Sequence, residues 1–169
     1  MMVIVIGMDN TGKTTLVEGM RKKMSLVNYN KSPGILPPDI QKDWLVVQAT
    51  KKSKRVELYE RFPLFEEMVY GPVLRQASNF QWGDSYFKLI KDLKPLIIYT
   101  RPTLQTVLDF KDREQMDGVI REAKTLLNRF DELAFRLMAD KWKVLPYDYD
   151  VYPVDWVTYW VQKGGRFDE

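Results

Sequence analysis

The sequence predicts an α/β fold: three α/β/α layers around a five-stranded parallel sheet. Short apolar runs alternate with segments of helical periodicity along the chain, as in strands joined by crossover helices. The runs at residues 2–6 and 96–99 are continuously hydrophobic, which is typical of strands buried on both faces. A length of 169 residues and 45% hydrophobic content fit a single domain, residues 1–169, with its own core.

The strands are expected where short apolar runs occur in this alternation. The second and third runs mix apolar and polar residues, whereas the first and fourth do not. The predicted strands are residues 2–6, 26–29, 55–59, 96–99 and 143–147.

The helices are expected in the gaps between these strands. The first follows a glycine-rich turn, Gly71-Pro72 is expected to end the third, and the fifth is the longest, with apolar residues at spacings of three and four. The second is expected to face inward with Ile40, Trp44, Val47 and Gln48. The predicted helices are residues 13–23, 39–51, 64–69, 84–93, 116–138 and 153–164.

The glycine-rich turn after the first strand reads Gly-Met-Asp-Asn-Thr-Gly-Lys-Thr-Thr, residues 7–15. This is the complete P-loop pattern, G-x-x-x-x-G-K-[ST], between a predicted strand and a predicted helix. Such a loop wraps a phosphate with backbone N–H groups at a helix N-terminus. The turn therefore predicts an ATP site, with the Thr14 hydroxyl on Mg²⁺. The predicted ATP-binding residues are Gly7, Asn10, Thr11, Gly12, Lys13, Thr14 and Thr15.

The amino-acid composition restricts the kinds of catalysis that the chain can perform. The chain has no cysteine and no histidine, which excludes thiol nucleophiles, thiolate metal sites and histidine-based proton transfer. Phosphoryl transfer is least affected, because it runs on positioning and on charge from Lys, Arg and Mg²⁺. A net charge of +3 makes nucleic acid an unlikely partner. With neither a signal peptide nor an apolar stretch of membrane length, we expect no membrane association and a cytoplasmic protein.

Five segments should meet at one rim, because ligand-binding loops of a parallel sheet lie beyond the carboxyl ends of its strands. At this rim Glu60 is a candidate for holding Mg²⁺, and Arg61 for holding a phosphate bidentately, unless the two form a surface ion pair. Arg101 either reaches a phosphate or braces its loop. Asp9, inside the P-loop, would repel phosphates unless it contacts the acceptor substrate. The five segments are residues 7–15, 31–38, 60–63, 100–103 and 147–153.

Further candidates for the acceptor site lie near this rim. Lys31 offers a cation in a rigid loop, and Arg75 can read a carbonyl group. Phe65 and Tyr70 can stack on a base, although a lone phenylalanine is more often part of a core. Trp44 has the same two interpretations, core residue or base platform.

Residues 110–116 form a charged connection before the longest helix. Such a segment can close over a triphosphate as a lid and bring Lys111 or Arg113 to the γ-phosphate. The alternative is an ordinary solvated helix start, with Asp112 as its cap.

Together these residues resemble the thymidylate kinase family of P-loop nucleoside monophosphate kinases, most of all its short phage-encoded deoxynucleoside monophosphate kinases. The resemblance rests on the acidic residue of the P-loop, on Glu60-Arg61-Phe62 after the third strand, and on Tyr70. It also rests on Arg101-Pro102 and on the run 112–115 before a long helix. It spans nearly the whole chain.

The resemblance implies transfer of the γ-phosphoryl group of ATP·Mg to a nucleoside monophosphate, usually dTMP, to give the diphosphate. Asp9 would contact the deoxyribose and Arg61 the acceptor phosphate, with Glu60 near the metal. The cation that serves the γ-phosphoryl group beside Lys13 stays open among Arg101, Lys111 and Arg113. The base stays open between thymine and a modified pyrimidine such as 5-hydroxymethyluracil.

The family commonly forms homodimers, for which Phe80 and Trp82 are candidate interface residues. A phage origin would place the protein in the host cytoplasm. Two other functions stay open: a phage P-loop kinase that acts on a modified base in DNA, and an ATP-binding switch module that is not a kinase.

Overall fold

A computed structural model of the 169-residue chain describes all residues except 33, 114–116, 168 and 169. It contains a five-stranded sheet in the order β2-β3-β1-β4-β5, in which every neighbouring pair is parallel. The predicted α/β fold class is confirmed, and the strand ends differ from the predicted ones by at most two residues. The strands are β1 (Met2–Ile6), β2 (Val27–Lys31), β3 (Val56–Glu60), β4 (Leu96–Thr100) and β5 (Lys143–Tyr147).

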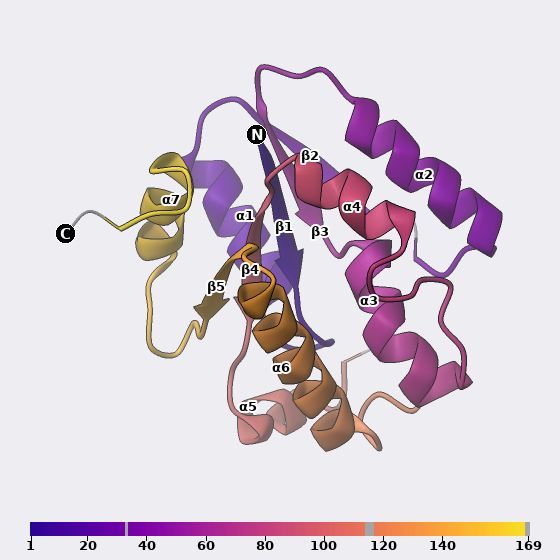
Figure 1. Cartoon of the computed structure of the whole chain (residues 1–169). Helices are drawn as coiled ribbons and strands as arrows, with labels where there is room; N and C mark the ends of the chain where they lie inside the picture. Colours follow the sequence, from indigo (N-terminus) through magenta and orange to yellow (C-terminus); the bar gives the residue numbers. More distant parts are fainter. Residues whose placement is uncertain (33, 114–116, 168–169) are drawn as a thin grey trace.

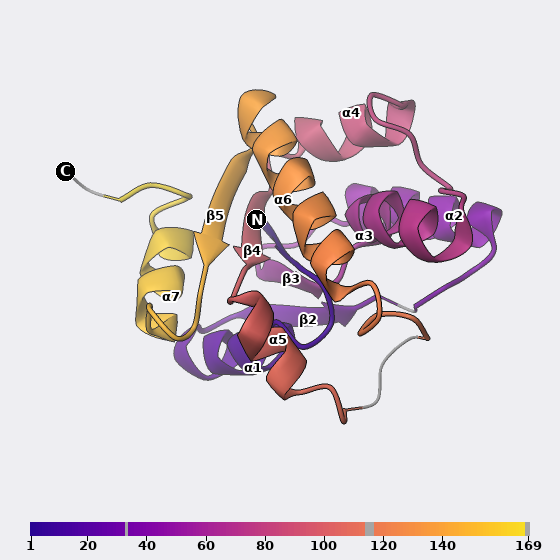
Figure 2. The same ribbon diagram turned by 90° about the horizontal axis from the view of Figure 1, so that it is seen from below.

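Helices cover both faces of the sheet (Figures 1 and 2). Alternate residues of the central strand β1 enter two separate cores: Ile4 and Ile6 pack on one side, and Val3 and Val5 on the other. The first core is covered by α2, α3, α4, α5 and α6, and the second by α1 and α7. The helices are α1 (Lys13–Lys23), α2 (Pro38–Thr50), α3 (Pro63–Tyr70), α4 (Ser85–Asp92), α5 (Leu104–Asp109), α6 (Ala123–Ala139) and α7 (Val154–Gln162).

The inward face of helix α2 is predicted only in part: Gln48 is buried and Trp44 packs against the core, whereas Ile40 and Val47 do not face inward. Gln41, Leu45 and Gln48 are buried, whereas Ile40 and Val47 are 51% and 56% exposed. The glutamines can occupy inner positions because each has a polar partner, as buried amides require. Gln48 Oε1 accepts from the Tyr59 hydroxyl at 3.2 Å, and the partners of Gln41 line the site described below.

Helix α3 ends at Tyr70, directly before Gly71-Pro72, as predicted, but the chain does not leave the helical path there. The chain continues as a π-helical turn, Gly71–Arg75, in which the helix widens. Proline has no N–H to donate, so a widened turn at this point costs little hydrogen bonding. The turn carries Arg75 into the site.

The longest helix begins at Ala123, not at residue 116. Residues 117–122 form turns, and Gly118 has a φ of +85°, a left-handed conformation that interrupts an α-helix. The first two turns of the predicted helix are therefore a loop, with residues 114–116 outside the described part of the chain.

The two aromatic residues proposed for a dimer interface pack against other residues of the same chain. Phe80 is 2% exposed, and Trp82 lies between the Phe87 ring, 4.9 Å away, and the Arg136 guanidinium, 4.2 Å above its plane. Neither ring forms an exposed apolar surface.

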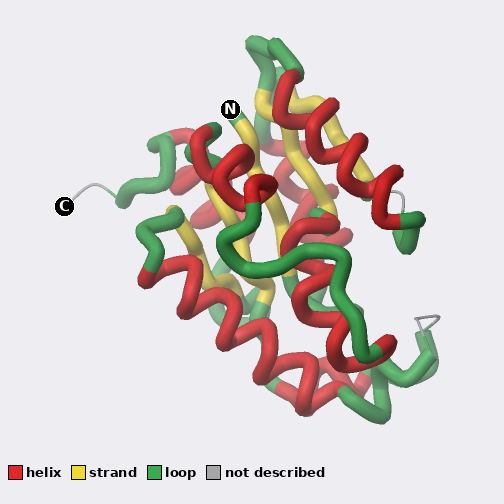
Figure 3. The backbone as a smooth tube through the Cα atoms, turned by 45° about the vertical axis from the view of Figure 1, so that its right-hand side comes forward, coloured by secondary structure: helices red, strands yellow, loops and turns green. Residues whose placement is uncertain are grey.

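Because all strands run parallel, their carboxyl ends share one edge of the sheet, and the loops predicted to meet there do so. Figure 3 shows the strands in yellow between the surrounding helices in red.

None of the described helices is long and apolar enough to cross a bilayer.

Candidate active site

The loop between β1 and α1 has the backbone of a phosphate-binding turn. Gly7 and Gly12 have φ values of +142° and +81°, which side-chain-bearing residues rarely adopt. A Cβ atom at Gly7 would lie 2.3 Å from Thr100 Oγ1, and one at Gly12 would lie 2.7 Å from the Tyr149 ring. The loop therefore packs tightly against β4 and the β5–α7 loop, which fixes the first turn of α1.

Lys13 is held inside this loop. Its Nζ donates hydrogen bonds to the carbonyl oxygens of Gly7 and Met8, and the residue is 4% exposed. Burial lowers the pKa of Lys13 to about 8, so the ammonium is still mostly charged at neutral pH. A phosphate in the loop would find this cation already in place.

A polar cavity of about 180 Å³ opens above the loop, and we call it the phosphate cavity. Besides residues 9–15 of the P-loop it is lined by Glu60, Arg61 and Arg113. The predicted ATP-binding residues, apart from Gly7 at the root of the loop, thus converge with three charged side chains from elsewhere in the chain.

Thr14 and Glu60, the predicted magnesium ligands, are in contact. The Thr14 hydroxyl donates to Glu60 Oε1, and the Tyr29 hydroxyl donates to Glu60 Oε2. A hydroxyl and a carboxylate at the edge of a phosphate cavity fit Mg²⁺, which takes few protein oxygens and completes its shell with water and substrate phosphates.

A second cavity, of about 280 Å³, adjoins the first on the side of α7, and we call it the aromatic cavity. Tyr147, Tyr149, Tyr152 and Phe110 give it flat apolar walls, and Gly12 and Thr15 form its floor. Its composition suits a planar ring bound by stacking.

Arg113 lines both the phosphate cavity and the aromatic cavity. Its guanidinium stacks on Phe110, with Cζ 4.2 Å from the ring centroid. The Asn10 side chain donates to the Phe110 carbonyl oxygen at 3.1 Å, which ties residue 110 to the P-loop. Lys111 is exposed and does not line the described cavities.

A third cavity, of about 60 Å³, lies on the other side of Arg61, and we call it the α3 cavity. One face of helix α3 forms its wall, with Pro63, Glu66, Glu67 and Tyr70 at helical spacing. Its remaining lining residues are Ser32, Gly34, Ile35, Gln41, Arg61 and Arg75.

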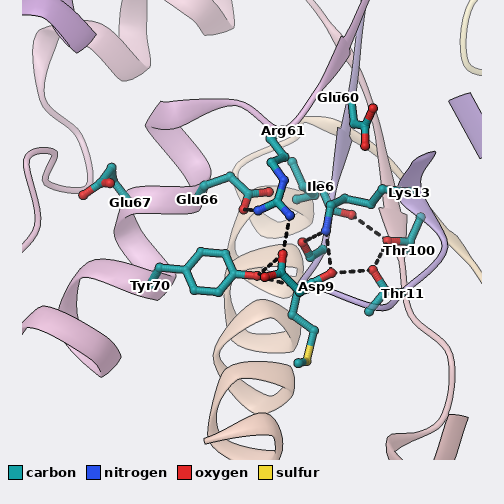
Figure 4. Close-up of polar contacts among 12 residues, drawn as sticks. Ile6, Asp9, Thr11, Lys13, Glu60, Arg61, Glu66, Glu67, Tyr70 and Thr100 are labelled. Atoms are coloured by element: carbon teal, nitrogen blue, oxygen red, sulfur yellow. Dashed lines mark hydrogen bonds and ion pairs between the residues drawn. The ribbon is translucent and has the colours of Figure 1, made fainter. Parts of the chain in front are cut away.

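Arg61 separates the phosphate cavity from the α3 cavity and lines both. Its φ of +65° is a left-handed conformation that is uncommon outside glycine, and it aims the side chain back over the P-loop. The guanidinium pairs with Asp9 and lies 3.9 Å from Glu66 Oε2 (Figure 4). The predicted acceptor residues Asp9 and Arg61 are thus brought together.

Tyr70 and Arg75 reach the α3 cavity as well. The Tyr70 hydroxyl accepts from the backbone N–H of Asp9 at 2.9 Å, which fixes the P-loop against α3. Arg75 donates to both oxygens of Glu67 at 2.8 Å, and Gln41 donates to Glu67 at 3.4 Å.

Glu66 differs from the other carboxylates of the site. It is 7% exposed, and neither of its oxygens has a hydrogen-bond partner among the described residues. Burial raises the pKa of Glu66 to about 7. Figure 4 shows the side chain beside Arg61, whereas Glu67 points away from it.

Two of the three aromatic residues predicted to contact a base, Phe65 and Trp44, are core residues. Phe65 is wholly buried, with the rings of Phe62, Phe87 and Trp142 within 6.0 Å of its centroid, so no face is left for a base. Trp44 packs edge-on against Tyr59 and Phe62 and lines none of the three cavities. Apolar periodicity alone could not separate these rings from ligand-facing ones.

Two of the predicted cations lie outside the site. Arg101 is paired with Asp131 on α6 through two hydrogen bonds, at 2.8 and 3.0 Å, and so braces its loop, which corrects the expectation that it reaches a phosphate. Lys31 is exposed at the end of β2, and Ser32 and Gly34 of the same loop line the α3 cavity instead.

We expect Arg101→Ala to lower stability and to leave catalysis nearly intact. Loss of the paired, partly buried guanidinium should cost about 1–2 kcal/mol, or a few degrees in Tm. The rate of ADP formation should change by less than about threefold, since the side chain lines none of the three cavities. Arg129→Ala, which removes an exposed pair with Glu132 on the same helix, is the control. A loss of activity beyond tenfold would return Arg101 to the catalytic set.

Sequence reasoning missed Glu66, Glu67 and Gln41. Their signal was present: polar residues stood on the inward faces of two otherwise apolar helices. Tyr149, which packs on Gly12, was also missed, because nothing in the local pattern shows that the β5–α7 loop folds over the P-loop.

No family model and no curated protein sequence matches this chain. Solved structures do match it. The YorR protein from Bacillus subtilis, in complex with phosphorylated GDP, is 14% identical with a TM-score of 0.72, and the match covers 100% of both chains. A deoxyadenosine kinase from M. mycoides, with dCMP and dCDP bound, is 16% identical over 97% of both chains, with a TM-score of 0.57. The thymidylate kinase from Candida albicans is 13% identical over 96% of this chain and 89% of its own, with a TM-score of 0.55. At these identities the matches show a shared fold.

Proposed function

We propose that the protein transfers the γ-phosphoryl group of ATP to a nucleoside monophosphate and releases the diphosphate, with dTMP or a related or modified pyrimidine deoxynucleotide as the first candidate acceptor. One observation carries this proposal: Arg61 lines both the cavity above the P-loop and the α3 cavity. Two anions placed on either side of one guanidinium are in position for in-line transfer between them.

On the donor side, the P-loop would hold the triphosphate and the aromatic cavity the adenine. Lys13 and Arg113 supply positive charge to the γ-phosphoryl oxygens, with Arg113 presented by the described part of the lid, residues 110–113. Thr14 and Glu60 would hold Mg²⁺, which neutralises phosphate charge when bound.

On the acceptor side, Arg61 would exchange its partner. Without substrate it is paired with Asp9. An acceptor phosphate can take over the guanidinium and leave the Asp9 carboxylate for a sugar hydroxyl. Tyr70 and Arg75 would then border the nucleoside. The attacking atom is an oxygen of a phosphate dianion, so the reaction needs no general base and a chain without histidine can perform it.

The nucleotides bound in the matching structures support a nucleotide-handling site. YorR was solved with phosphorylated GDP, and the M. mycoides kinase with dCMP and dCDP. This support is by analogy of fold, so the acceptor is a matter for experiment.

A second candidate acceptor is an unphosphorylated deoxynucleoside. The observation in its favour is charge: the three carboxylates Asp9, Glu66 and Glu67 face two arginines, Arg61 and Arg75, around the α3 cavity. This balance is poorer for a phosphate dianion than for a neutral sugar hydroxyl.

An acceptor screen tests the proposal. Purified protein with ATP and Mg²⁺ should form ADP above the ATP-only blank when a deoxynucleoside monophosphate is added. The panel holds dTMP, dUMP, dCMP, dAMP, dGMP, hydroxymethyl-dUMP, the matching nucleosides and duplex DNA. ADP formation with nucleosides alone would favour the second candidate, and formation with DNA alone would favour a DNA-base kinase. Slow hydrolysis that no acceptor stimulates would contradict both and favour a switch module. Light scattering on the same sample tests the expected homodimer.

A further inference from the structure

The α3 cavity holds a carboxylate that the proposed reaction does not use. Glu66 is 7% exposed, it lines this cavity, and neither oxygen accepts a hydrogen bond from the described residues. Its nearest charged group is the Arg61 guanidinium, at 3.9 Å, which is beyond hydrogen-bond distance.

Buried polar groups almost always have hydrogen-bond partners, because an unpaired one loses its hydration without compensation. Glu66 is also surrounded by groups that are already engaged. Arg61 is paired with Asp9, Lys13 donates to two carbonyl oxygens, and the Tyr70 hydroxyl donates to Asp9 Oδ1 at 3.5 Å. The backbone N–H of Gly7 also faces Glu66 and lowers its pKa, but it makes no hydrogen bond of normal geometry with either oxygen. A donor of good geometry therefore has to come from outside this set.

The other carboxylates that face Arg61 and Arg75 already have partners within the chain. Glu67 accepts from Arg75 with both oxygens. Asp9 is paired with Arg61, and in the proposed function it is released only to accept from a sugar hydroxyl. Glu66 is thus the carboxylate of the described cavity wall that is left to accept from a ligand.

We propose that Glu66 determines acceptor specificity by accepting a hydrogen bond from an N–H or O–H group of the nucleoside part of the acceptor. The inference rests on the proposed function, since it places the acceptor in the α3 cavity. A base N–H and a sugar hydroxyl share the chemistry that a carboxylate recognises, and the acceptors used in the test separate these two sources.

The proposal has a consequence for pH. Burial raises the pKa of Glu66 to about 7, so near neutrality the side chain passes between a protonated and an ionised form. A ligand donor favours the ionised form, whose two oxygens only accept. The charged and titratable groups that face it are Lys13, Arg61, Asp9 and Tyr70. The pKa values of Arg61 and Tyr70 are raised and lie above this window, whereas Lys13, with a pKa of about 8, begins to lose its proton at the upper end. The acceptor KM should therefore rise as pH falls from 8 to 6.

The experiment is a cycle between Glu66→Gln and modified acceptors. The best acceptor of the screen is compared with its base-methylated analogue, which lacks the ring N–H or carries a blocked amino group, and with its 2′,3′-dideoxy analogue. Glu66→Gln should lower kcat/KM for the parent by about 10- to 100-fold, the usual value of a hydrogen bond to a charged group. With one of the two analogues this loss should disappear, which identifies the donor as base or sugar. The acceptor KM of the variant should also depend less steeply on pH between 6 and 8 than that of the wild type, the remaining slope being that of the acceptor phosphate and of Lys13.

Glu57→Gln is the matched control. Glu57 is equally buried, at 7% exposure, but it accepts from Asn28 and Asn30 at the opposite end of β3. This control should lower Tm without any acceptor-dependent effect. Glu66 accepts no hydrogen bond of normal geometry, so Glu66→Gln should lower Tm less than Glu57→Gln does.

The proposal is overturned if Glu66→Gln keeps wild-type kcat/KM, or if its loss is the same on all three acceptors, since a structural role would act uniformly. In either case the wild type still phosphorylates the parent, and the proposed function stands. If the wild type phosphorylates no acceptor, the proposed function fails first and this inference falls with it.

Discussion

Lys13→Met should abolish ADP formation, with a loss of at least about 10³-fold in kcat. The ammonium is buried in the P-loop and lies where the β- and γ-phosphates of ATP would sit, so its removal takes away charge that no other described residue supplies from inside the loop. Methionine is close to lysine in length and leaves no large cavity, so the fold should persist. A coupled assay for ADP with the best acceptor measures the effect.

The stability of this variant should show that burial of the Lys13 ammonium destabilises the folded chain. Burial lowers the pKa of Lys13 from 10.5 to about 8 in the folded chain. Between pH 8 and 10.5 the unfolded chain binds more protons than the folded one. The free energy of unfolding of the wild type should therefore rise relative to that of Lys13→Met as pH increases through this window. Lys23→Ala, at the exposed end of the same helix, is the control and should keep full activity. Undiminished ADP formation by Lys13→Met would refute the assignment of the P-loop.

Strands β1 and β4 could be predicted closely because strands buried on both faces form continuous apolar runs. The mixed strand β2, which is only half-buried, was predicted from its place in the alternation, and its end differs from the predicted one by two residues. The inward face of helix α2 could be predicted only in part. Gln48 was expected there, but Ile40 and Val47 were expected in place of Gln41 and Leu45, because apolar side chains at helical spacing normally face the core. The start of α6 failed for a local reason: the apolar spacing continues through Gly118, but the backbone there turns left-handed.

The candidate site divides in the same way. The P-loop residues were predictable because one contiguous pattern carries them, and Glu60-Arg61 because it ends a strand at the known rim. Arg101 also ends a strand there, yet it turns to Asp131, a partner 30 residues away that no local pattern indicates. Glu66 and Phe65 are neighbours in sequence, but Glu66 lines the α3 cavity and Phe65 lies in the core. Only the rotation of α3 about its axis decides between them.

The second large effect is expected at Arg61, which lies between the phosphate cavity and the α3 cavity. Arg61→Ala should lower kcat/KM for the acceptor by about 10²- to 10⁴-fold, because the acceptor phosphate loses its bidentate partner and its alignment with the γ-phosphoryl group. ATP hydrolysis without acceptor, and the Kd for ATP, should change by less than about threefold, since the donor is held by the P-loop and the aromatic cavity. This split between donor and acceptor constants distinguishes an acceptor clamp from a general loss of structure.

Two further variants separate charge from geometry. Arg61→Lys keeps a cation between Asp9 and Glu66, so it should recover most of the stability that Arg61→Ala loses, but little of the activity, because an ammonium lacks the planar fork. Arg55→Ala, on the exposed approach to the same strand, should match the wild type in both measurements. If Arg61→Ala raised the acceptor KM no more than Arg55→Ala does, the α3 cavity would not be the acceptor site, and the bridging position of the guanidinium would be structural only.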